Sequence, residues 1–221
     1  MSEVAVSVLT VEKENAVSTF YNLETAKVDY FHIDVMDGKF VEKDNLEQMK
    51  DYALTLSHIT NVSLDVHLMV DNIEKWIDEY TMIGPKIISF HYEAFSDKEK
   101  ILENINNIKQ EGCKAGLAIN PETPVEKILD FLPYIHQVLV MTVKPGKGGQ
   151  KLIPETIEKI KQLYEYREKN GLDYEIEADG GITNENAQIL REAGCDRLVS
   201  GNYLLKADNY AEAVKKIKGE K

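Results

Sequence analysis

The sequence predicts an α/β fold, a (β/α)8 TIM barrel in which eight parallel strands close into a ring surrounded by helices. Eight short apolar runs rich in Val, Ile and Leu alternate with longer segments of helical periodicity along the 221 residues. Such alternation is typical of parallel strands joined by right-handed crossovers. An open doubly wound sheet is the alternative, but it usually begins with a G-x-G-x-x-G fingerprint, which does not follow the first run. We therefore expect a single barrel domain over residues 1–221.

The apolar runs are expected to be the barrel strands, since each is short and rich in β-branched residues. In chain order they cover residues 4–9, 29–35, 62–69, 87–93, 114–119, 137–143, 174–180 and 197–202. Between them, segments such as 71–84 and 97–112 carry apolar residues at i, i+3, i+4 and i+7, which predicts amphipathic helices. Glycines stand where helix C-caps are expected, at Gly84, Gly112, Gly171 and Gly194.

The composition argues against several classes of partner. A formal net charge of −12 repels nucleic acid and anionic lipid, although backbone dipoles can still hold a small anion locally. No apolar run approaches the roughly 18–20 residues that span a membrane, and the first residues lack the basic region of a signal peptide. Cys113 and Cys195 do not have metal-ligand spacing. We expect two core thiols in a cytoplasmic protein.

Polar side chains share one face of several expected strands. Because side chains alternate along a strand, this face lies opposite the apolar residues that pack on the helices, so it points into the barrel. In chain order the set is His32, Asp34 and Met36, then Asp65, His67 and Met69, then His91 and Glu93, then Glu175, Glu177 and Asp179. A single buried His or Asp is more often a hydrogen-bonded core group than a ligand, but here three strands contribute to one end.

Two imidazoles and two carboxylates near the ends of these strands suit one divalent transition metal ion: zinc, iron(II), manganese or cobalt. Such an ion would also offset the cost of burying the charged groups. Asp65, His91 and Glu177 would lie one layer below and would orient the ligands.

A glycine-rich stretch, VKPGKGGQ (143–150), follows the sixth expected strand. Glycines let backbone N–H groups approach an anion closely. Gly180 and Gly181 follow the seventh strand, and Gly201 and Asn202 follow the eighth, where barrels usually bind phosphate. Together the three loops predict a phosphate site.

A metal beside a phosphate pocket favours proton transfer next to a carbonyl group. The ion would polarise a ketone, and carboxylates on opposite walls could exchange protons with the two faces of the neighbouring carbon. This arrangement inverts a stereocentre. Metal-assisted hydrolysis is the competing reaction, but no Ser–His or Cys–His nucleophile pair is apparent.

Five motifs carry a family resemblance. They are HIDVMDG (32–38), LDVHLM (64–69), NPETPVE (120–126), VMTVKPGKGGQ (140–150) and EIEADGG (175–181). With these motifs the chain resembles, almost from end to end, the ribulose-phosphate 3-epimerase family and the related allulose-6-phosphate 3-epimerases. The related orotidine monophosphate decarboxylase group carries D-x-K-x-x-D, whereas His67 stands here in the place of the lysine. Decarboxylation is therefore not expected.

The resemblance implies a ribulose-phosphate-binding barrel with one divalent metal on His32, Asp34, His67 and Asp179. Asp34 and Asp179 would also be the acid–base residues. The implied contacts to a small phosphorylated sugar are Ser7, His67, Gly146, Lys147, Gly148, Gly149, Gly180, Gly181, Gly201 and Asn202. Three methionines match family positions near the metal, although core filling explains them equally well: Met36, Met69 and Met141. Family members associate as dimers or larger rings, so a homo-oligomer is expected.

The chain departs from the family pattern at several positions. Val6 stands in place of Pro, Lys147 in place of an apolar residue, and Asn202 in place of Ser; residues 42–44 read Glu-Lys-Asp where Pro-Asn is usual. No departure removes a ligand or a catalytic carboxylate, so the chemistry is expected to be intact. Residues 42–44 are expected at the mouth of the site, so the departure there is expected to affect substrate specificity. The expected substrate is D-ribulose 5-phosphate, converted to D-xylulose 5-phosphate; D-allulose 6-phosphate, converted to D-fructose 6-phosphate, is the runner-up. A non-catalytic sugar-phosphate-binding barrel is the alternative of another class.

Overall fold

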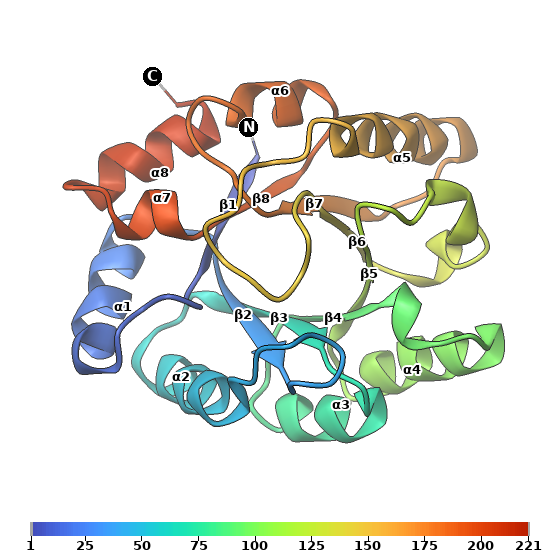
Figure 1. Cartoon of the computed structure of the whole chain (residues 1–221), viewed down its shortest axis with the longest axis horizontal. Coiled ribbons are helices and arrows are strands. Elements are labelled where there is room, and N and C mark those ends of the chain that lie inside the picture. The colour runs from blue at the N-terminus through green and yellow to red at the C-terminus, as the bar shows by residue number, and fades with distance from the viewer. Residues whose placement is uncertain (1, 221) are drawn as a thin grey trace.

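The structure, a computed structural model that describes residues 2–220, is a closed barrel of eight parallel strands (Figure 1). Each strand pairs with its neighbours in sequence, and the last strand pairs with the first. The strands are β1 (Glu3–Ser7), β2 (Tyr30–Met36), β3 (Ser63–Met69), β4 (Ile87–His91), β5 (Lys114–Ile119), β6 (Gln137–Met141), β7 (Glu175–Asp179) and β8 (Arg197–Ser200). The predicted fold class is confirmed, and each predicted strand overlaps an observed one.

Helices surround the barrel (Figure 1). They are α1 (Ala16–Thr25), α2 (Leu46–Ile59), α3 (Ile73–Thr81), α4 (Lys98–Gln110), α5 (Thr156–Asn170), α6 (Ala187–Glu192), α7 (Asn202–Leu205) and α8 (Tyr210–Lys218). The 3-10 turns are Lys13–Asn15, Tyr92–Ala94, Val125–Lys127 and Leu132–Tyr134. The connection between β5 and β6 contains two of these turns in place of an α-helix. Its prolines, Pro121, Pro124 and Pro133, explain the difference, since proline inside a helix removes a hydrogen bond and clashes with the preceding turn.

The main apolar core lies between the strands and the helices. Phe31, Ile33 and Val35 on the outer face of β2 are fully buried in it. The inner face of the same strand carries His32 and Asp34, because successive side chains point to opposite sides. The same alternation on the other strands places further polar side chains inside the barrel, beside two small apolar clusters.

Glycines follow the helices where the sequence predicts helix ends. Gly171 caps α5 in the left-handed conformation with a φ of 62°. Gly84, Gly112 and Gly194 have positive φ just after α3, α4 and α6, so these predicted helix ends are confirmed. Both cysteines are buried and free, as expected. Among the helices in residues 2–220, none combines the length and the apolar character that a membrane crossing needs.

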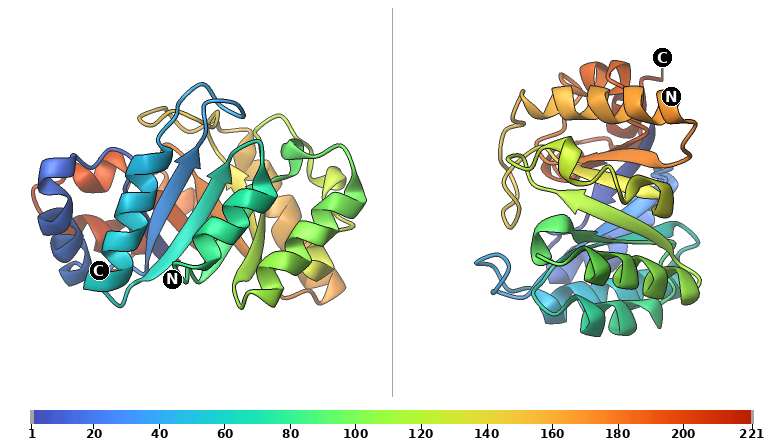
Figure 2. Two further views of the ribbon diagram at one scale, coloured as in Figure 1. Left: turned by 90° about the horizontal axis from the view of Figure 1, so that it is seen from below. Right: turned by 90° about the vertical axis from the view of Figure 1, so that its right-hand side faces the viewer.

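Two long loops rise at the same end of the barrel, where the strand C-termini meet (Figure 2). One connects β2 to α2 and the other connects β6 to α5. A Cβ atom added to Gly146 of the second loop would lie only 2.8 Å from Cβ of Val41 in the first. Only glycine allows this approach, and the φ of 96° at Gly146 also favours it. The two loops therefore meet at the mouth of the barrel.

Candidate active site and metal centre

Four side chains from β2, β3 and β7 converge near the C-terminal end of the barrel interior. They are His32, Asp34, His67 and Asp179, and their donor atoms lie within 4.8 Å of one another. Asp34 Oδ1 lies 3.4 Å from Nε2 of His32 and 3.2 Å from Nδ1 of His67. Asp179 Oδ2 lies 3.9 Å and 3.8 Å from the same two nitrogens. The four predicted metal ligands are thus brought together.

These donor atoms fit a single divalent ion. Atoms bound to one ion at about 2.1 Å lie roughly 3 to 4 Å from one another, which is the spacing found here. His32 Nε2 is buried and has no hydrogen-bond partner among the described residues, a costly state unless the nitrogen binds an ion. A set of two imidazole nitrogens and two carboxylate oxygens suits zinc, iron(II), manganese or cobalt.

Hydrogen bonds from the far side of each imidazole fix its orientation. His32 Nδ1 lies 3.0 Å from Oδ2 of Asp65. His67 Nε2 lies 2.9 Å from Nε2 of His91, and His91 Nδ1 lies 3.1 Å from Oε2 of Glu93. With Nδ1 of His67 free to bind an ion, its Nε2–H donates to His91, whose Nδ1–H donates to the Glu93 carboxylate. This chain of donors holds one tautomer in each ring.

The two carboxylates of the cluster have opposite pKa shifts. Although burial opposes ionisation, the imidazoles of His32 and His67 hold the pKa of Asp34 well below its usual value. Burial, and next the charge of Asp34, raise the pKa of Asp179 to about 7. The Ser7 hydroxyl donates to Oδ2 of Asp34 at 2.7 Å, which also favours the ionised form. Without a metal ion and near neutral pH, Asp34 is therefore ionised, whereas Asp179 is close to the midpoint of its titration.

A cavity of about 1100 Å³ opens at the barrel mouth above this cluster. Ser7, Asp34 and Asp179 line it, whereas both histidine ligands are fully buried behind them. His67, which was also expected to contact the substrate, is not among the lining residues because Asp34 and His91 cover its ring. The three predicted methionines line the cavity: Met36, Met69 and Met141.

The three predicted phosphate loops surround the same cavity. The lining residues from these loops include Gly146, Lys147, Gly148, Gly149, Gly180, Gly181, Gly201 and Asn202. The N–H groups of residues 146–149 donate to no other group of the described chain, so they are available to an anion. The Thr10 hydroxyl donates to Oδ1 of Asn202 at 2.9 Å, which turns the Asn202 amide nitrogen toward Gly149.

The β2–α2 loop is anchored by two polar side chains. Asp37 Oδ1 accepts two backbone N–H groups within the loop, from Lys39 and Phe40. The buried Asn45 side chain donates to the Asp34 carbonyl and accepts from the Met36 N–H, both at 2.8 Å. Residues 42–44, where the sequence departs from the family pattern, are exposed and are not among the residues that line the cavity. The departure from the family pattern at residues 42–44 therefore alters the solvent-exposed surface of the loop and not the cavity lining.

Sequence reasoning missed a second polar group inside the barrel. Ser89, Gln137 and Arg197 are fully buried below the candidate metal ligands. Arg197 is two residues before Val199 on the inner face of β8, so a charged residue at an inward position was the available signal. Thr10 at the cavity gave no signal, because periodicity does not locate loop residues.

A sequence model of the ribulose-phosphate 3 epimerase family matches residues 3–205. The chain belongs to the ribulose-phosphate 3-epimerase family. The relatives include the ribulose-phosphate 3-epimerases of Synechocystis sp., 35% identical over 99% of this chain and 94% of the relative, and of Bacillus subtilis, 35% identical over 100% of both chains. The ribulose-5-phosphate-3-epimerase of Arabidopsis chloroplasts is 39% identical over 90% of this chain and 70% of its own.

Solved structures agree with the fold. The crystal structure of KGPDC from Streptococcus mutans has a TM-score of 0.74 at 11% identity and covers 99% of this chain and 96% of its own. A 3-hexulose-6-phosphate synthase has a TM-score of 0.72 at 12% identity, with 98% of each chain covered. At these identities the likeness shows the barrel alone. Membership of the ribulose-phosphate 3-epimerase family identifies the chain as an isomerase of the sugar-phosphate epimerase type.

Proposed function

We propose that this protein epimerises C3 of a ketose phosphate, with D-ribulose 5-phosphate and D-xylulose 5-phosphate as the substrate pair. The observation that carries the proposal is the pair of carboxylates, Asp34 and Asp179, which face one cavity and belong to one cluster of candidate metal ligands. Two neighbouring carboxyl groups suit an acid and a base acting on one carbon.

The residues of the cluster have two roles, metal binding and proton transfer. A divalent ion held by His32, Asp34, His67 and Asp179 would polarise the ketone at C2 and offset negative charge on its oxygen. In one direction, the ionised Asp34 accepts the proton from C3, and the C2–C3 bond gains the double-bond character of an enediolate. The protonated Asp179 then donates a proton to the opposite face of C3. In the other direction the two carboxyl groups exchange roles.

The cavity supports binding of a phosphorylated substrate. Unbonded N–H groups at 146–149, together with the loops at Gly181 and Gly201, would hold the phosphate near the mouth. The hydrogen bond from Ser7 orients Asp34, and the imidazoles of His32 and His67 are fully buried, so water does not reach the ion site from behind them. A distal phosphate would then position C3 between the two carboxyl groups.

The choice of pentose substrate rests on the relatives, several of which are named ribulose-phosphate 3-epimerase. D-Allulose 6-phosphate is the runner-up because the same residues would perform the same chemistry on it. A non-catalytic sugar-phosphate-binding barrel is less well supported, since binding alone does not require two opposed carboxyl groups. A cytoplasmic location is part of the proposal, and the two free thiols support it.

Hydrogen exchange at C3 tests the proposal. The protein is stripped with a chelator, loaded in turn with zinc, iron(II), manganese or cobalt, and incubated in D2O with each ketose phosphate. We expect deuterium at C3 of D-ribulose 5-phosphate and D-xylulose 5-phosphate, measured by NMR, and much slower exchange by the stripped protein. Exchange confined to D-allulose 6-phosphate would establish the runner-up. Absence of exchange with every sugar and every metal would refute the epimerase proposal.

A further inference from the structure

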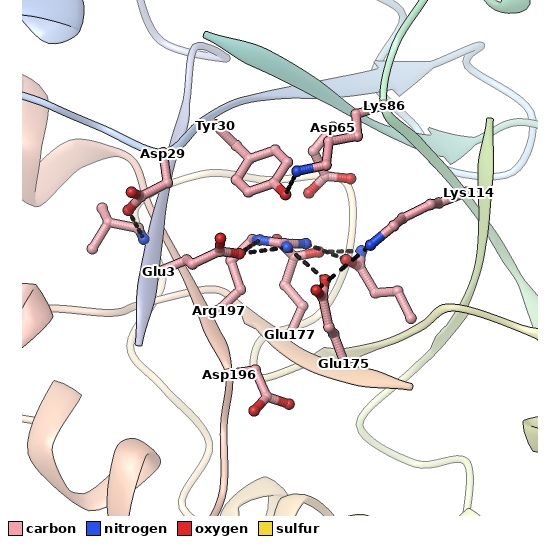
Figure 3. A network of polar contacts seen from close by, with 12 residues as sticks. Glu3, Asp29, Tyr30, Asp65, Lys86, Lys114, Glu175, Glu177, Asp196 and Arg197 are labelled. Carbon is pink, nitrogen blue, oxygen red and sulfur yellow. Dashed lines mark hydrogen bonds and ion pairs between the residues drawn. The ribbon is translucent and has the colours of Figure 1, made fainter. Parts of the chain in front are cut away.

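Arg197 lies inside the barrel at the end opposite the candidate metal centre. Its side chain is fully buried, and its guanidinium group lies between the carboxylates of Glu3 and Glu175 (Figure 3). Both contacts are 2.6 Å long. The ring of Tyr30 covers the guanidinium group, with the ring centroid 3.9 Å from Cζ. The arginine is thus held in one orientation.

The remaining guanidinium nitrogen, Nη1, points toward the barrel axis and donates to Oε1 of Gln137. An amide that accepts with its oxygen must present its nitrogen elsewhere, so Arg197 determines how the Gln137 amide is turned. Its Nε2 donates to the Ser89 hydroxyl at 3.1 Å and to Oε2 of Glu177. All these side chains are fully buried, so water cannot replace any of the contacts.

From Glu177 the contacts continue to the metal centre. Donor atoms of Glu177, Asp65 and His32 lie within 4.8 Å of one another, and Oε1 of Glu177 lies 3.9 Å from Nδ1 of His32. Asp65 in turn holds Nδ1 of His32 at 3.0 Å, while Nε2 of His32 faces the other metal ligands. A continuous series of buried polar contacts therefore joins Arg197 at one end of the barrel to a metal ligand at the other. It passes through β8, β6, β7, β3 and β2.

We propose that Arg197 and Gln137 are positioning residues for the metal centre, because they fix Glu177, which together with Asp65 lies against Nδ1 of His32 and so sets the orientation of the His32 ring. The inference rests on the metal site of the proposed function. If the Gln137 amide turns over, its oxygen faces the Glu177 carboxyl group, and Glu177 must shift relative to Asp65 and His32. The partner of His32 then changes, and so does the direction in which Nε2 points.

The placement of the charges supports a positioning role. The side chains of Glu3 and Glu175 are 46% and 36% exposed, so solvent can hydrate them if Arg197 is absent. Gln137 and Glu177 have no such access. Removal of the Arg197 side chain should therefore disturb Gln137 and Glu177 more than Glu3 and Glu175.

Cobalt(II) binding tests this proposal, since the visible spectrum of the ion reports its ligand geometry. The variants are Arg197→Met, Gln137→Met and the double variant that carries both substitutions. Each is compared with the wild-type protein. Arg167→Met is the matched control, because Arg167 pairs with Asp196 near β8 but does not contact Gln137. Affinity is measured by competition with a chelator, and the melting temperature is recorded for every variant.

Each single variant should bind cobalt(II) roughly tenfold more weakly than wild type, as is usual when residues that orient metal ligands are lost. Their cobalt spectra should also shift. The double variant should be no weaker than the weaker single variant, since both changes break the same series of contacts. Arg167→Met should keep wild-type affinity and spectrum even if its melting temperature falls.

Other results would overturn the proposal. Cobalt affinity within twofold of wild type and an unchanged spectrum in either single variant would leave the network a structural role only. Additive losses in the double variant would show two independent effects. Deuterium exchange at C3 by the wild-type protein is measured in parallel: a wild type that binds cobalt(II) but does not exchange refutes the epimerase activity, while the cobalt affinities still decide the positioning role.

Discussion

Asp34 and Asp179 differ in their surroundings although both belong to one cluster. Asp34 accepts from Ser7 and lies close to both imidazoles, so its ionised form is stabilised. Asp179 lies farther from the same nitrogens and is exposed to the charge of Asp34. The pair therefore titrates in two separate steps, as interacting carboxyl groups do. Their asymmetry is a property of the folded chain, since the two residues are far apart in sequence.

Asp179→Asn should reduce kcat by about a thousandfold or more, because the amide can neither accept nor donate the proton at C3. Metal content is measured beside turnover, since the variant also loses a ligand oxygen. The control is Asp208→Asn, an exposed carboxylate that lines the cavity but does not belong to the metal-ligand cluster, which should keep near wild-type turnover. An Asp179→Asn protein with near wild-type activity at full metal occupancy would refute its acid–base role.

At the scale of loops and helices, close backbone contacts determine the shape of the phosphate loops. Gly181 has a φ of 68°, and a Cβ atom there would lie 2.4 Å from the backbone nitrogen of Leu152. Gly171 has a similar φ of 62° at the end of α5, but nothing lies within 4 Å of its Cβ position. Substitution of Gly171 therefore measures the cost of the left-handed backbone alone, whereas substitution of Gly181 adds the cost of a steric clash.

Gly171→Ala should destabilise the protein by about 1–2 kcal/mol, the usual cost of the left-handed conformation, and should leave KM unchanged. Gly181→Ala should cost more and should raise KM for the sugar phosphate, since the β6–α5 loop must move away from the β7 end. Thermal unfolding and steady-state kinetics of both variants check this expectation. Equal KM values in the two variants would show that this contact does not shape the phosphate site.

At the same scale, the sequence predicted the regular elements better than the connections. Alternation along β2 and β3 correctly placed His32, Asp34 and His67 on the inner face. The segment between β5 and β6 was identified only as a motif, because prolines in it prevent a helix without specifying the turns that replace it. Residues 42–44 were expected to affect specificity, but the direction of an exposed loop depends on its tertiary anchors, Asp37 and Asn45.

At the scale of the whole molecule, the polar interior links stability to pH. A group whose pKa is raised by folding stabilises the protein below its unfolded pKa, and this contribution is lost as the pH rises through the folded pKa. Burial, opposed by His32, raises the pKa of Asp179 to about 7, and burial also raises that of Glu177. The pKa of His32 is raised as well, since the nearby carboxylates outweigh the effect of burial. Burial lowers the pKa of His67, His91 and His136, so their contribution to stability has the opposite sign and is present above the ordinary histidine value of 6.5.

The metal-free protein should therefore lose stability between pH 6.5 and about pH 8, where the remaining shifted groups all act in one direction. Metal binding favours deprotonated ligands, so the loaded protein should show a smaller loss. Melting temperatures of chelator-treated and cobalt-loaded samples at the two pH values check the expectation. A metal-free protein that becomes more stable over this interval would contradict it.

The sequence alone also could not reveal how the interior is connected. The contacts among Arg197, Gln137 and Glu177 join three strands, and each depends on strand register and on the turn of a side-chain amide. Periodicity gives the face of a strand that a residue occupies, but not its partner across the barrel.

The burial of the two imidazoles has a consequence for the order of assembly. The carboxylates of Asp34 and Asp179 reach solvent only slightly, and they do so through the cavity that the sugar would fill. An arriving ion must travel through that same space before it meets His32 and His67. Loading would therefore be sequential, with the ion first and the sugar second, and a sugar in place would slow the escape of the ion beneath it.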